Sequence, residues 1–443
     1  MLAEIFNFRK VLFPLVLTGL AVAMGLAVLD WDTNIRHFND MMYFDNYAIS
    51  FTVVMLVTVF LWFLLSSDYV RKSSHETDFT SLIIFSLAGG VVMVSFADLT
   101  MLFLGLEILS IAMYIMAAAN KSELRSNEAG FKYFMLGAFA TGFLLFGIAL
   151  IYGAVGSFNL QEISGYVSAN RGNLPVIFNA GVVLMMVGLI FKVSAAPFHF
   201  WAPDVYEGAP SPVTAYMSTV VKTAAFAAFL RLFMICFSSL ADWWGPLLAI
   251  CSALTMLAGN ILAVYQKSIK RMLAYSSVSH AGYMLMAIVA MHQNSDSALL
   301  MYTAAYSIGS IGIFTLVLTM TKNQNETLSS LKGFASVNKV PAFIISVIML
   351  SLAGIPPVAG FFAKYYVFTT TLDKDYTWLV ILAVISSLVG VYYYFKVIIA
   401  MYQPADRDSV QMEISPMHQM VLWITLVITV GLGLAPGFLL GLI

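Results

Sequence analysis

Long apolar stretches, separated by short polar segments, follow one another along the whole chain. Thirteen of them have about 18 or more mostly apolar residues, the length that a helix needs to cross a bilayer. They cover residues 11–29, 48–65, 79–97, 99–119, 131–155, 175–201, 211–237, 243–265, 272–291, 297–320, 340–368, 378–402 and 418–442. The pattern predicts an all-α polytopic membrane protein with about thirteen transmembrane helices and no room for an extramembrane catalytic domain.

Two of these stretches are interrupted by proline. The eleventh, residues 340–368, would be about 44 Å long as one straight helix, against a hydrocarbon core of about 30 Å. Pro356 and Pro357 stand near its middle, and each proline removes a backbone donor and clashes with the preceding turn. The sixth stretch, residues 175–201, carries Pro197 in its second half. We therefore expect a broken helix at each of these places.

The spacing of the two breaks suggests an internal repeat. If spans three to seven and spans eight to twelve are copies of one five-helix unit, the second copy starts from the opposite side of the membrane. Inverted repeats with discontinuous helices recur in ion-translocating proteins, with sites near the midplane. The chain is thus predicted to comprise N-terminal helices at 1–78, a first repeat at 79–237, an inverted second repeat at 243–402 and a C-terminal helix at 403–443.

Composition agrees with a membrane location. Hydrophobic residues make up 60% of the 443 residues and charged residues only 10%, and the mean hydropathy is +0.88. A soluble globular domain has about a quarter charged residues. The composition therefore excludes a soluble domain.

The 22 Lys and Arg residues are distributed unequally between the two predicted sides of the membrane. Fourteen fall on one side, and they are Arg9, Lys10, Arg71, Lys72, Lys121, Arg125, Lys132, Lys267, Lys270, Arg271, Lys322, Lys332, Lys339 and Arg407. Only Arg36, Arg171 and Lys374 fall on the other. Because cytoplasmic loops carry the excess of basic residues, we expect the N-terminus in the cytoplasm and the C-terminus outside. The first span lacks a small-residue cleavage site after Leu29, so we interpret it as a retained helix rather than a signal peptide.

Charged residues inside the apolar spans are the main functional signal. They include Glu107, Lys192, Lys222, Lys364 and Lys396. A lysine at bilayer depth costs about 2.5–3.5 kcal/mol even on the lower of the published scales, and such residues commonly mark an ion or proton path.

Lys192 and Glu107 are predicted to act as a pair. Lys192 precedes the break at Pro197, where unwound backbone provides carbonyls and room for water. Glu107 lies near the centre of the fourth span, which holds no basic residue, so its partner must come from another helix. We expect that partner to be Lys192, with the carboxylate holding the lysine protonated until the two separate. The alternatives are a lysine that extends to the interface and a static structural ion pair.

Three further lysines differ in depth. Lys222 lies in the middle of the seventh span, beside Thr219 and Thr223, whose hydroxyls can relay protons through water. Lys364 follows the Pro356–Pro357 break by two turns and mirrors Lys192 in the other half. Lys396 is nearer the cytoplasmic end of the twelfth span, and it is expected either to join the path or only to extend to the interface.

His280 lies in a polar ladder within the ninth span, and its near-neutral titration suits a proton relay between two lysines. The alternative is a histidine that is hydrogen-bonded to hydroxyls of a neighbouring helix. His199, Asp204 and Glu207, at the end of the sixth span, are candidates for a cytoplasmic access point or for structural caps. Arg231 is expected to pair with a carboxylate or a carbonyl and receives no role.

The sequence holds no redox or nucleotide site of its own. Cys236 and Cys251 are the only cysteines, whereas an iron–sulfur cluster normally needs four thiolates. The histidines are scattered, so metal ligation is not expected, and neither a P-loop nor a strand-borne GxGxxG occurs. Any redox or ATP chemistry must therefore belong to a partner.

Four stretches resemble the antiporter-like membrane subunits of respiratory complex I. They are FLGLEILS at 103–110, FKVSAAPFHFWAPDVYEGAP at 191–210, KRMLAYSSVSHAGY at 270–283 and SLAGIPPVAGFFAK at 351–364. Within that family the chain is most similar to the N-type subunits of proton-translocating NADH–quinone oxidoreductase. Three features indicate this: the stretch at residues 203–210, a Lys rather than a Glu at 364, and an end at span thirteen. The resemblance covers nearly the whole chain.

The resemblance implies roles for the buried charges. Glu107 and Lys192 would be the charged pair of the first half-channel, Lys222 the connecting lysine, Lys364 the residue of the second half-channel and His280 a residue of the central hydrophilic axis. FMN, iron–sulfur clusters and quinone would be bound by partner subunits, which include neighbouring membrane subunits and a peripheral electron-transfer arm. The resemblance implies a location in the cell inner membrane and no nucleic-acid partner.

Two other functions remain open from the sequence. One is a subunit of a multi-component Na⁺/H⁺ antiporter, built from the same repeats without redox partners; residues 203–210 favour the oxidoreductase. The other is a structural scaffold whose buried charges only fix helix packing, as buried ion pairs sometimes do.

Overall fold

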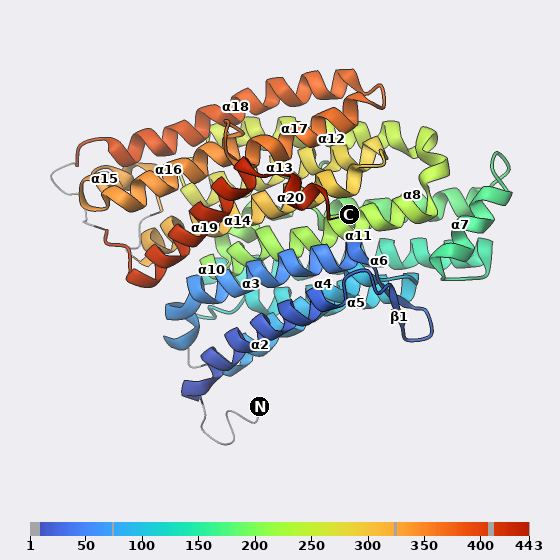
Figure 1. The fold of residues 1–443 in the computed structure, drawn as a ribbon, viewed down its shortest axis with the longest axis horizontal. Coiled ribbons are helices and arrows are strands. Elements are labelled where there is room, and N and C mark those ends of the chain that lie inside the picture. The colour runs from blue at the N-terminus through green and yellow to red at the C-terminus, as the bar shows by residue number, and fades with distance from the viewer. Residues whose placement is uncertain (1–8, 73–74, 323–325, 406–411, 443) are drawn as a thin grey trace.

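The computed structural model describes residues 9–72, 75–322, 326–405 and 412–442. Within these ranges the chain forms a bundle of helices and one short antiparallel hairpin of strands β1 (Ile35–His37) and β2 (Met42–Phe44), in which Arg36 pairs with Tyr43 (Figure 1). The α-helices are α2 (Arg9–Leu29), α3 (Asn46–Lys72), α4 (Glu76–Ser95), α5 (Leu99–Ala117), α6 (Leu124–Val155), α7 (Leu160–Ala169), α8 (Val176–Lys192), α9 (Trp201–Gly208), α10 (Ser211–Tyr216), α11 (Lys222–Cys236), α12 (Ala241–Val264), α13 (Ile269–Ala290), α14 (Ser295–Lys322), α15 (Phe334–Val337), α16 (Lys339–Ala353), α17 (Ala359–Leu372), α18 (Thr377–Tyr402), α19 (Pro416–Leu434) and α20 (Gly437–Leu440).

The helices confirm the predicted polytopic all-α fold. Eleven helices of the described residues are long and apolar enough to cross a membrane, counting α10 and α11 as one span. The two remaining predicted spans, the sixth and the eleventh, are the interrupted ones. The sixth, residues 175–201, contains α8 and the non-helical residues 193–200 and ends where α9 begins, and the eleventh contains α16 and most of α17. The boundaries of the two five-helix repeats stay a prediction.

The first break separates α8 from α9. Helix α8 ends at Lys192, and residues 193–200 are not helical. Ser194 has a positive φ of 58°, and the Ala196 amide donates to the Thr255 hydroxyl of α12 at 2.8 Å. Backbone groups that the helix no longer satisfies are therefore bonded to a neighbouring helix.

The second break separates α16 from α17. Gly354 ends α16 with φ +87°, a left-handed conformation that glycine adopts without the steric penalty of a Cβ atom. Gly360, in the first turn of α17, approaches α16 so closely that a Cβ atom would lie 1.8 Å from the Ser351 carbonyl oxygen. The two half-helices therefore meet closely at the break.

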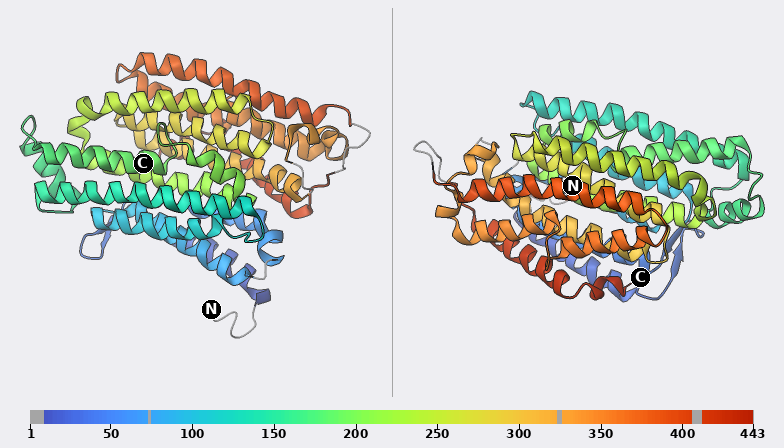
Figure 2. Two further views of the ribbon diagram at one scale, coloured as in Figure 1. Left: turned by 180° about the vertical axis from the view of Figure 1, so that it is seen from behind. Right: turned by 90° about the horizontal axis from the view of Figure 1, so that it is seen from above.

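Three spans form the centre of the bundle. In the most apolar windows of the α10–α11 span, α13 and α14, 89%, 94% and 94% of the residues are buried, against 39% for α6 and α18 and 11% for α2. A helix that is buried on all sides needs no amphipathic pattern. Figure 2 shows α18 and α6 at the outside of the bundle. The core therefore surrounds the α10–α11 span, α13 and α14.

The connections gather at two ends of the bundle, which we call the α15 end and the α7 end after the short helices there (Figure 1). At the α15 end, Gly333 bonds to Gln403 and Ile269 bonds to Glu326. The connections that precede α3, α5, α12 and α18 meet at the α7 end.

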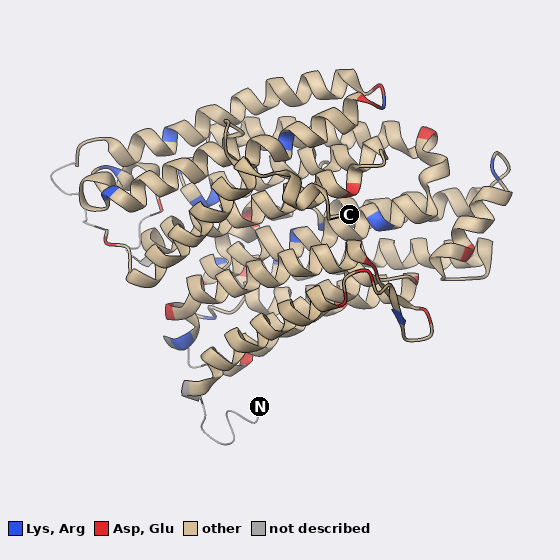
Figure 3. Ribbon diagram, viewed as in Figure 1, with Lys and Arg blue, Asp and Glu red and all other residues tan. Residues whose placement is uncertain are grey.

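The described basic residues follow the predicted sorting: the larger group lies toward the α15 end, while the loops at the α7 end carry Arg36, Arg171 and Lys374 (Figure 3). Arg407 lies outside the described residues.

Two features of the α7 end were not predicted. Helix α7 buries Leu160, Ile163 and Val167 and is capped by Asn159, whose side chain accepts from two backbone amides. The hairpin of β1 and β2 precedes α3. Both elements are too short to give a clear periodic signal among the apolar spans.

Candidate functional site

The predicted buried lysines and histidine lie in the interior. Exposed fractions are 5% for Lys192, 2% for Lys222, 7% for Lys364 and 4% for His280. Burying an ionisable group at bilayer depth is costly, so the contacts of each of these side chains bear on its role.

Lys192 is the last residue of α8. Its ammonium donates to the Ser110 hydroxyl of α5 at 2.6 Å and lies 5.7 Å from the centre of the Tyr133 ring. The carboxyl end of a helix carries a partial negative charge, which favours a cation there. The break thus places Lys192 at the end of a half-helix, where both the dipole and a hydroxyl stabilise it.

The predicted direct contact between Glu107 and Lys192 is not formed. No ion pair within 4.0 Å joins them in the described part of the chain, and Ser110 is the acceptor instead. Glu107 lies one turn before Ser110 and is half-buried, on a side of α5 where Leu104 and Ile111 are exposed. Its carboxylate remains within electrostatic reach of Lys192. The sequence indicated that a partner of Glu107 must come from another helix, but it could not fix which way the carboxylate points.

Lys222 contacts α13 directly. A π-helical turn, Met217–Val221, precedes it, and such turns occur frequently at functional sites. The Lys222 ammonium donates to the Ser277 carbonyl at 2.7 Å and to the Ser277 hydroxyl at 2.6 Å. Both acceptors are uncharged.

His280 lies one turn beyond Ser277 on α13. Its Nδ1 is 2.8 Å from the Tyr302 hydroxyl, and its Nε2 is 3.0 Å from the Tyr394 hydroxyl. Tyr394 in turn is hydrogen-bonded to Ser276. Both imidazole nitrogens are therefore engaged by hydroxyl groups that can donate or accept.

Lys364 reaches back to the end of α16. Its ammonium donates to the Ala353 carbonyl at 2.7 Å and lies 5.1 Å from the centre of the Tyr283 ring. A Cβ atom on Gly354 would lie 2.8 Å from Lys364 Cδ. The second break therefore presents a carbonyl at the negative end of a half-helix to the lysine.

Helix α13 lines up these groups. Ser277, His280 and Tyr283 follow one another at intervals of three residues, which places them on one face of the helix. Ser277 binds Lys222, and Tyr283 lies beneath Lys364. One helix face therefore carries the residue that binds Lys222, the histidine and the tyrosine beside Lys364. Sequence reasoning had identified the polar ladder of α13 but not Tyr302, Tyr394 or Ser110, because a lone hydroxyl in an apolar span carries no distinctive signal.

The remaining candidates lie outside this row. Lys396 is half-buried on the peripheral helix α18. Arg231 is 4% exposed and bonds to Asp45 at 2.9 Å and to the Phe96 carbonyl at 3.0 Å. Arg231 thus has the carboxylate and carbonyl partners that the sequence led us to expect.

The polar groups of α9 form an ion network at the α15 end. Burial alone would raise the pKa of Asp204, but Lys132 at 3.0 Å and Arg271 at 3.2 Å outweigh it and hold the pKa of this carboxyl below its ordinary value. Glu207 pairs with Arg271 at 2.5 Å. His199 is buried, and its Nδ1 has no hydrogen-bond partner among the described residues.

The described residues contain no cluster of three His, Cys, Asp or Glu side chains that could hold a metal ion. Cys236 and Cys251 are both free and buried. The polar side chains of this interior are those of lysine, histidine, tyrosine and serine, which can donate hydrogen bonds and, except for lysine in its charged form, also accept them.

Comparisons with known proteins agree with one another. Residues 97–390 match the family described as "NADH:quinone oxidoreductase/Mrp antiporter, TM". The chain is 40% identical to NADH-quinone oxidoreductase subunit N of Flavobacterium psychrophilum over 446 residues, covering 100% of this chain and 97% of that protein. It is 41% identical to subunit N of Cytophaga hutchinsonii over 443 residues, covering 99% and 96%.

Solved structures give the same result. A chain of respiratory complex I from Thermus thermophilus with bound aureothin superimposes with a TM-score of 0.81 at 30% identity, covering 100% of this chain and 99% of that one. A chain of the Mrp complex from Dietzia sp. gives a TM-score of 0.90 at 20% identity over 100% of this chain and 93% of that one, which shows the fold alone. The chain therefore belongs to the NADH:quinone oxidoreductase/Mrp antiporter family of membrane subunits, within its subunit N branch.

Proposed function

We propose that this chain is a proton-translocating membrane subunit of an NADH–quinone oxidoreductase. The observation that carries the proposal is the buried row along α13, in which Ser277 accepts from Lys222, Tyr283 lies beside Lys364 and His280 stands between these two positions. Buried lysines whose hydrogen bonds go to uncharged groups are suited to exchanging protons rather than to fixing helices. A scaffold would instead be expected to pair its buried charges.

The energies involved are compatible with this role. Moving one charge against 100 mV costs about 2.3 kcal/mol. A hundredfold change in the proton affinity of a lysine supplies about 2.7 kcal/mol. A modest change in the electrostatic surroundings of one lysine is therefore enough to drive a proton across.

Lys192 and Glu107 form the first half of the path in this proposal. The Glu107 carboxylate attracts the Lys192 ammonium electrostatically without touching it. The Ser110 hydroxyl, one turn further along α5, accepts the hydrogen bond from Lys192. A movement of α5 relative to α8 changes the distance between the two charges. Such a movement alters the proton affinity of Lys192 without breaking an ion pair.

The redox chemistry belongs to other subunits in this proposal. FMN, iron–sulfur clusters and quinone are bound by partners, and neighbouring membrane subunits together with a peripheral arm complete the assembly. The α15 end faces the cytoplasm in the inner membrane because it carries the excess of basic residues. Lys396 is a less central candidate, since it lies on a peripheral helix.

A Na⁺/H⁺ antiporter subunit is the second candidate. The family that matches residues 97–390 is described as covering Mrp antiporter subunits as well, which keeps this function as the alternative. Relatives at 40% identity over the full length are named NADH-quinone oxidoreductase subunit N, and this favours the first function.

The test is NADH-driven proton uptake by inside-out vesicles from cells that lack the native chain and express Lys364→Ala. Lys374→Ala, an exposed lysine ten residues further on, is the matched control. We expect both complexes to assemble, and only Lys364→Ala to lose proton uptake. Full uptake in Lys364→Ala would contradict the proposal, and Na⁺-dependent proton movement without NADH would favour the antiporter.

A further inference from the structure

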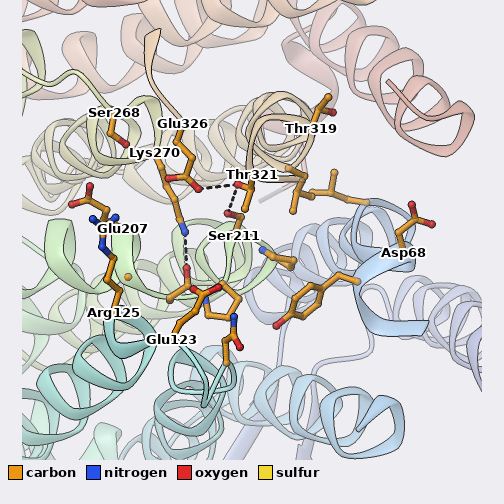
Figure 4. A pocket seen from close by; sticks show the side chains of 18 of the residues that line it. Asp68, Glu123, Arg125, Glu207, Ser211, Ser268, Lys270, Thr319, Thr321 and Glu326 are labelled. Carbon is orange, nitrogen blue, oxygen red and sulfur yellow. Dashed lines mark hydrogen bonds between the residues drawn. The ribbon is translucent and has the colours of Figure 1, made fainter. Parts of the chain in front are cut away.

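A large cavity opens at the α15 end of the bundle. It has a volume of about 710 Å³ and lies between α3, the connection before α6, the α9–α10 junction, α13, α14 and the start of α19 (Figure 4). Its lining is rich in ionisable side chains, namely Asp68, Glu123, Arg125, Glu207, Lys270, Glu326, Glu413 and His418. A space of this size and polarity can hold water in contact with the core of the bundle.

Lys270 closes the cavity toward the core. Only 4% of its surface is exposed, and its ammonium donates to the Ala209 carbonyl at the end of α9 at 2.6 Å (Figure 4). It is the second residue of α13, and the positive end of a helix dipole disfavours a cation. Glu207 and Glu326 line the same cavity within electrostatic reach. Lys270 therefore stands where its charge depends on the carboxylates of the cavity.

The face of α13 that bears Lys270 also bears the residue that binds Lys222 of α11. Ala274 and Ser277 follow Lys270 at intervals of four and three residues, so the three lie on one face over about 10 Å. Ser277 is the residue that binds Lys222.

A second, smaller cavity lies on this route. Its volume is about 10 Å³, at the lower limit of what can hold one water molecule. Ala274 and Ser276 line it from α13, together with Tyr206, Ser218 and Tyr306. Polar groups and space for water therefore occur between Lys270 and Lys222.

We propose that the large cavity is the mouth through which protons reach Lys222, and that Lys270 is a proton-carrying residue at its floor. The proposal rests on the proposed function above and names the access route to it. A neutral amine still donates to the Ala209 carbonyl, so Lys270 can lose its proton and keep its place. The proton then passes along α13, through the small cavity, to Ser277 and Lys222.

The first test replaces the lysine. NADH-driven proton uptake is measured in inside-out vesicles with Lys270→Met, and Lys267→Met serves as the control because Lys267 is exposed three residues earlier and does not line the cavity. Removing a positioned proton-transferring group slows transfer by about a hundredfold or more. We expect Lys270→Met to assemble and lose uptake, while Lys267→Met keeps it.

The second test leaves Lys270 in place. Thr321 lines the cavity and is exposed, whereas Ser336 is exposed at the same end away from the cavity. Each is replaced by cysteine, and inside-out vesicles are treated with a bulky, membrane-impermeant cationic thiol reagent. Proton uptake after labelling is compared with uptake before labelling in the same variant. We expect labelling of Thr321→Cys to block uptake and labelling of Ser336→Cys to leave it unchanged.

The outcomes separate this route from the proposed function. If Lys364→Ala loses uptake while Lys270→Met and labelled Thr321→Cys both pump normally, the function stands and the route is wrong. A failure of Thr321→Cys to react from the cytoplasmic side would also overturn the route, because the cavity would then be closed to the proton source. If Lys270→Met fails to assemble, the labelled Thr321→Cys decides.

Discussion

Each buried lysine of the proposed path is held by an uncharged oxygen atom. The pairs are Lys192 with Ser110, Lys222 with Ser277 and Lys364 with Ala353. A hydroxyl or carbonyl accepts a hydrogen bond from an ammonium and from a neutral amine alike. A carboxylate in contact would favour the charged form strongly. The lysines can therefore change charge without changing position.

Ser110→Asp should lock Lys192 in its charged form. Two unit charges about 4 Å apart interact by about 4 kcal/mol at the effective dielectric constant of a protein site. We expect Ser110→Asp to assemble but to lose proton pumping, and Ser110→Thr, which keeps the hydroxyl, to retain it. Proton uptake per NADH oxidised measures both. Equal pumping by the two variants would show that an uncharged acceptor is not needed.

We expect proton transfer through His280 to need both of its hydrogen-bonded tyrosines, Tyr302 and Tyr394. Neutral imidazole has one donor and one acceptor, and the hydroxyls of Tyr302 and Tyr394 satisfy either tautomer. Tyr302→Phe or Tyr394→Phe leaves a buried nitrogen without its partner, at a cost of about 1–3 kcal/mol.

We expect each of these tyrosine variants to pump more slowly, and Tyr265→Phe, at an exposed tyrosine, to be normal. Initial rates of NADH-driven proton uptake decide the matter. Unchanged rates in both tyrosine variants would remove the relay from the path.

At the residue scale, the sequence identified the groups that change charge but not those that hold them. A lysine in an apolar span is costly and therefore conspicuous. Ser110 looks like any small hydroxyl residue in a membrane helix, and the Ala353 carbonyl has no side-chain signal at all. The orientation of Glu107 depends on how α5 is rotated against its neighbours, which apolar composition alone does not determine.

At the scale of secondary-structure elements, the interrupted helices place helix carboxyl ends beside buried lysines. Where α8 and α16 end within the bundle, their carboxyl ends point into the interior, and a lysine lies at each. Both breaks were predicted from proline position and span length. The identity of the acceptor was not, because it depends on how α17 folds back onto the end of α16.

Gly354→Ala should disturb the second break for two reasons, the left-handed backbone conformation at this position and a steric contact of the new Cβ atom with Lys364. Gly156 ends α6 with φ +82° and no neighbour within 4 Å of an added Cβ, whereas Gly354 has φ +87° and Lys364 Cδ at 2.8 Å. A left-handed alanine costs about 1–2 kcal/mol at either position. The additional steric contact exists only at Gly354.

We therefore expect Gly156→Ala to destabilise the chain modestly and to pump normally, and Gly354→Ala to pump poorly because Lys364 is displaced. Thermal stability of the purified complex and NADH-driven uptake report the two effects separately. Normal pumping by an assembled Gly354→Ala complex would mean that the position of Lys364 is not critical.

At the scale of the whole molecule, charge and geometry distinguish the two ends. The large cavity and the ion network of Asp204, Glu207 and Arg271 lie at the α15 end, together with most of the described basic residues. The α7 end carries the strand hairpin and α7. This asymmetry is expected if one end collects protons from the cytoplasm.

The orientation can be tested by single cysteines at the two ends. The native Cys236 and Cys251 are 1% and 7% exposed, so background labelling should be low. Ser336→Cys at the α15 end and Ser168→Cys on α7 replace exposed serines. We expect an impermeant thiol reagent to label Ser336→Cys in inside-out vesicles and Ser168→Cys in right-side-out vesicles. The opposite pattern would reverse the assigned topology.

The most direct test concerns Lys222, because it joins the first half of the path to the row along α13. The measurement is NADH-driven proton uptake in inside-out vesicles that carry Lys222→Ala, with assembly of the complex checked in parallel and Lys267→Ala as the control. We predict an assembled complex whose proton uptake and coupled NADH oxidation are both lost. An assembled Lys222→Ala complex that pumps as well as the control would show that the buried lysine is structural and that protons do not pass this way.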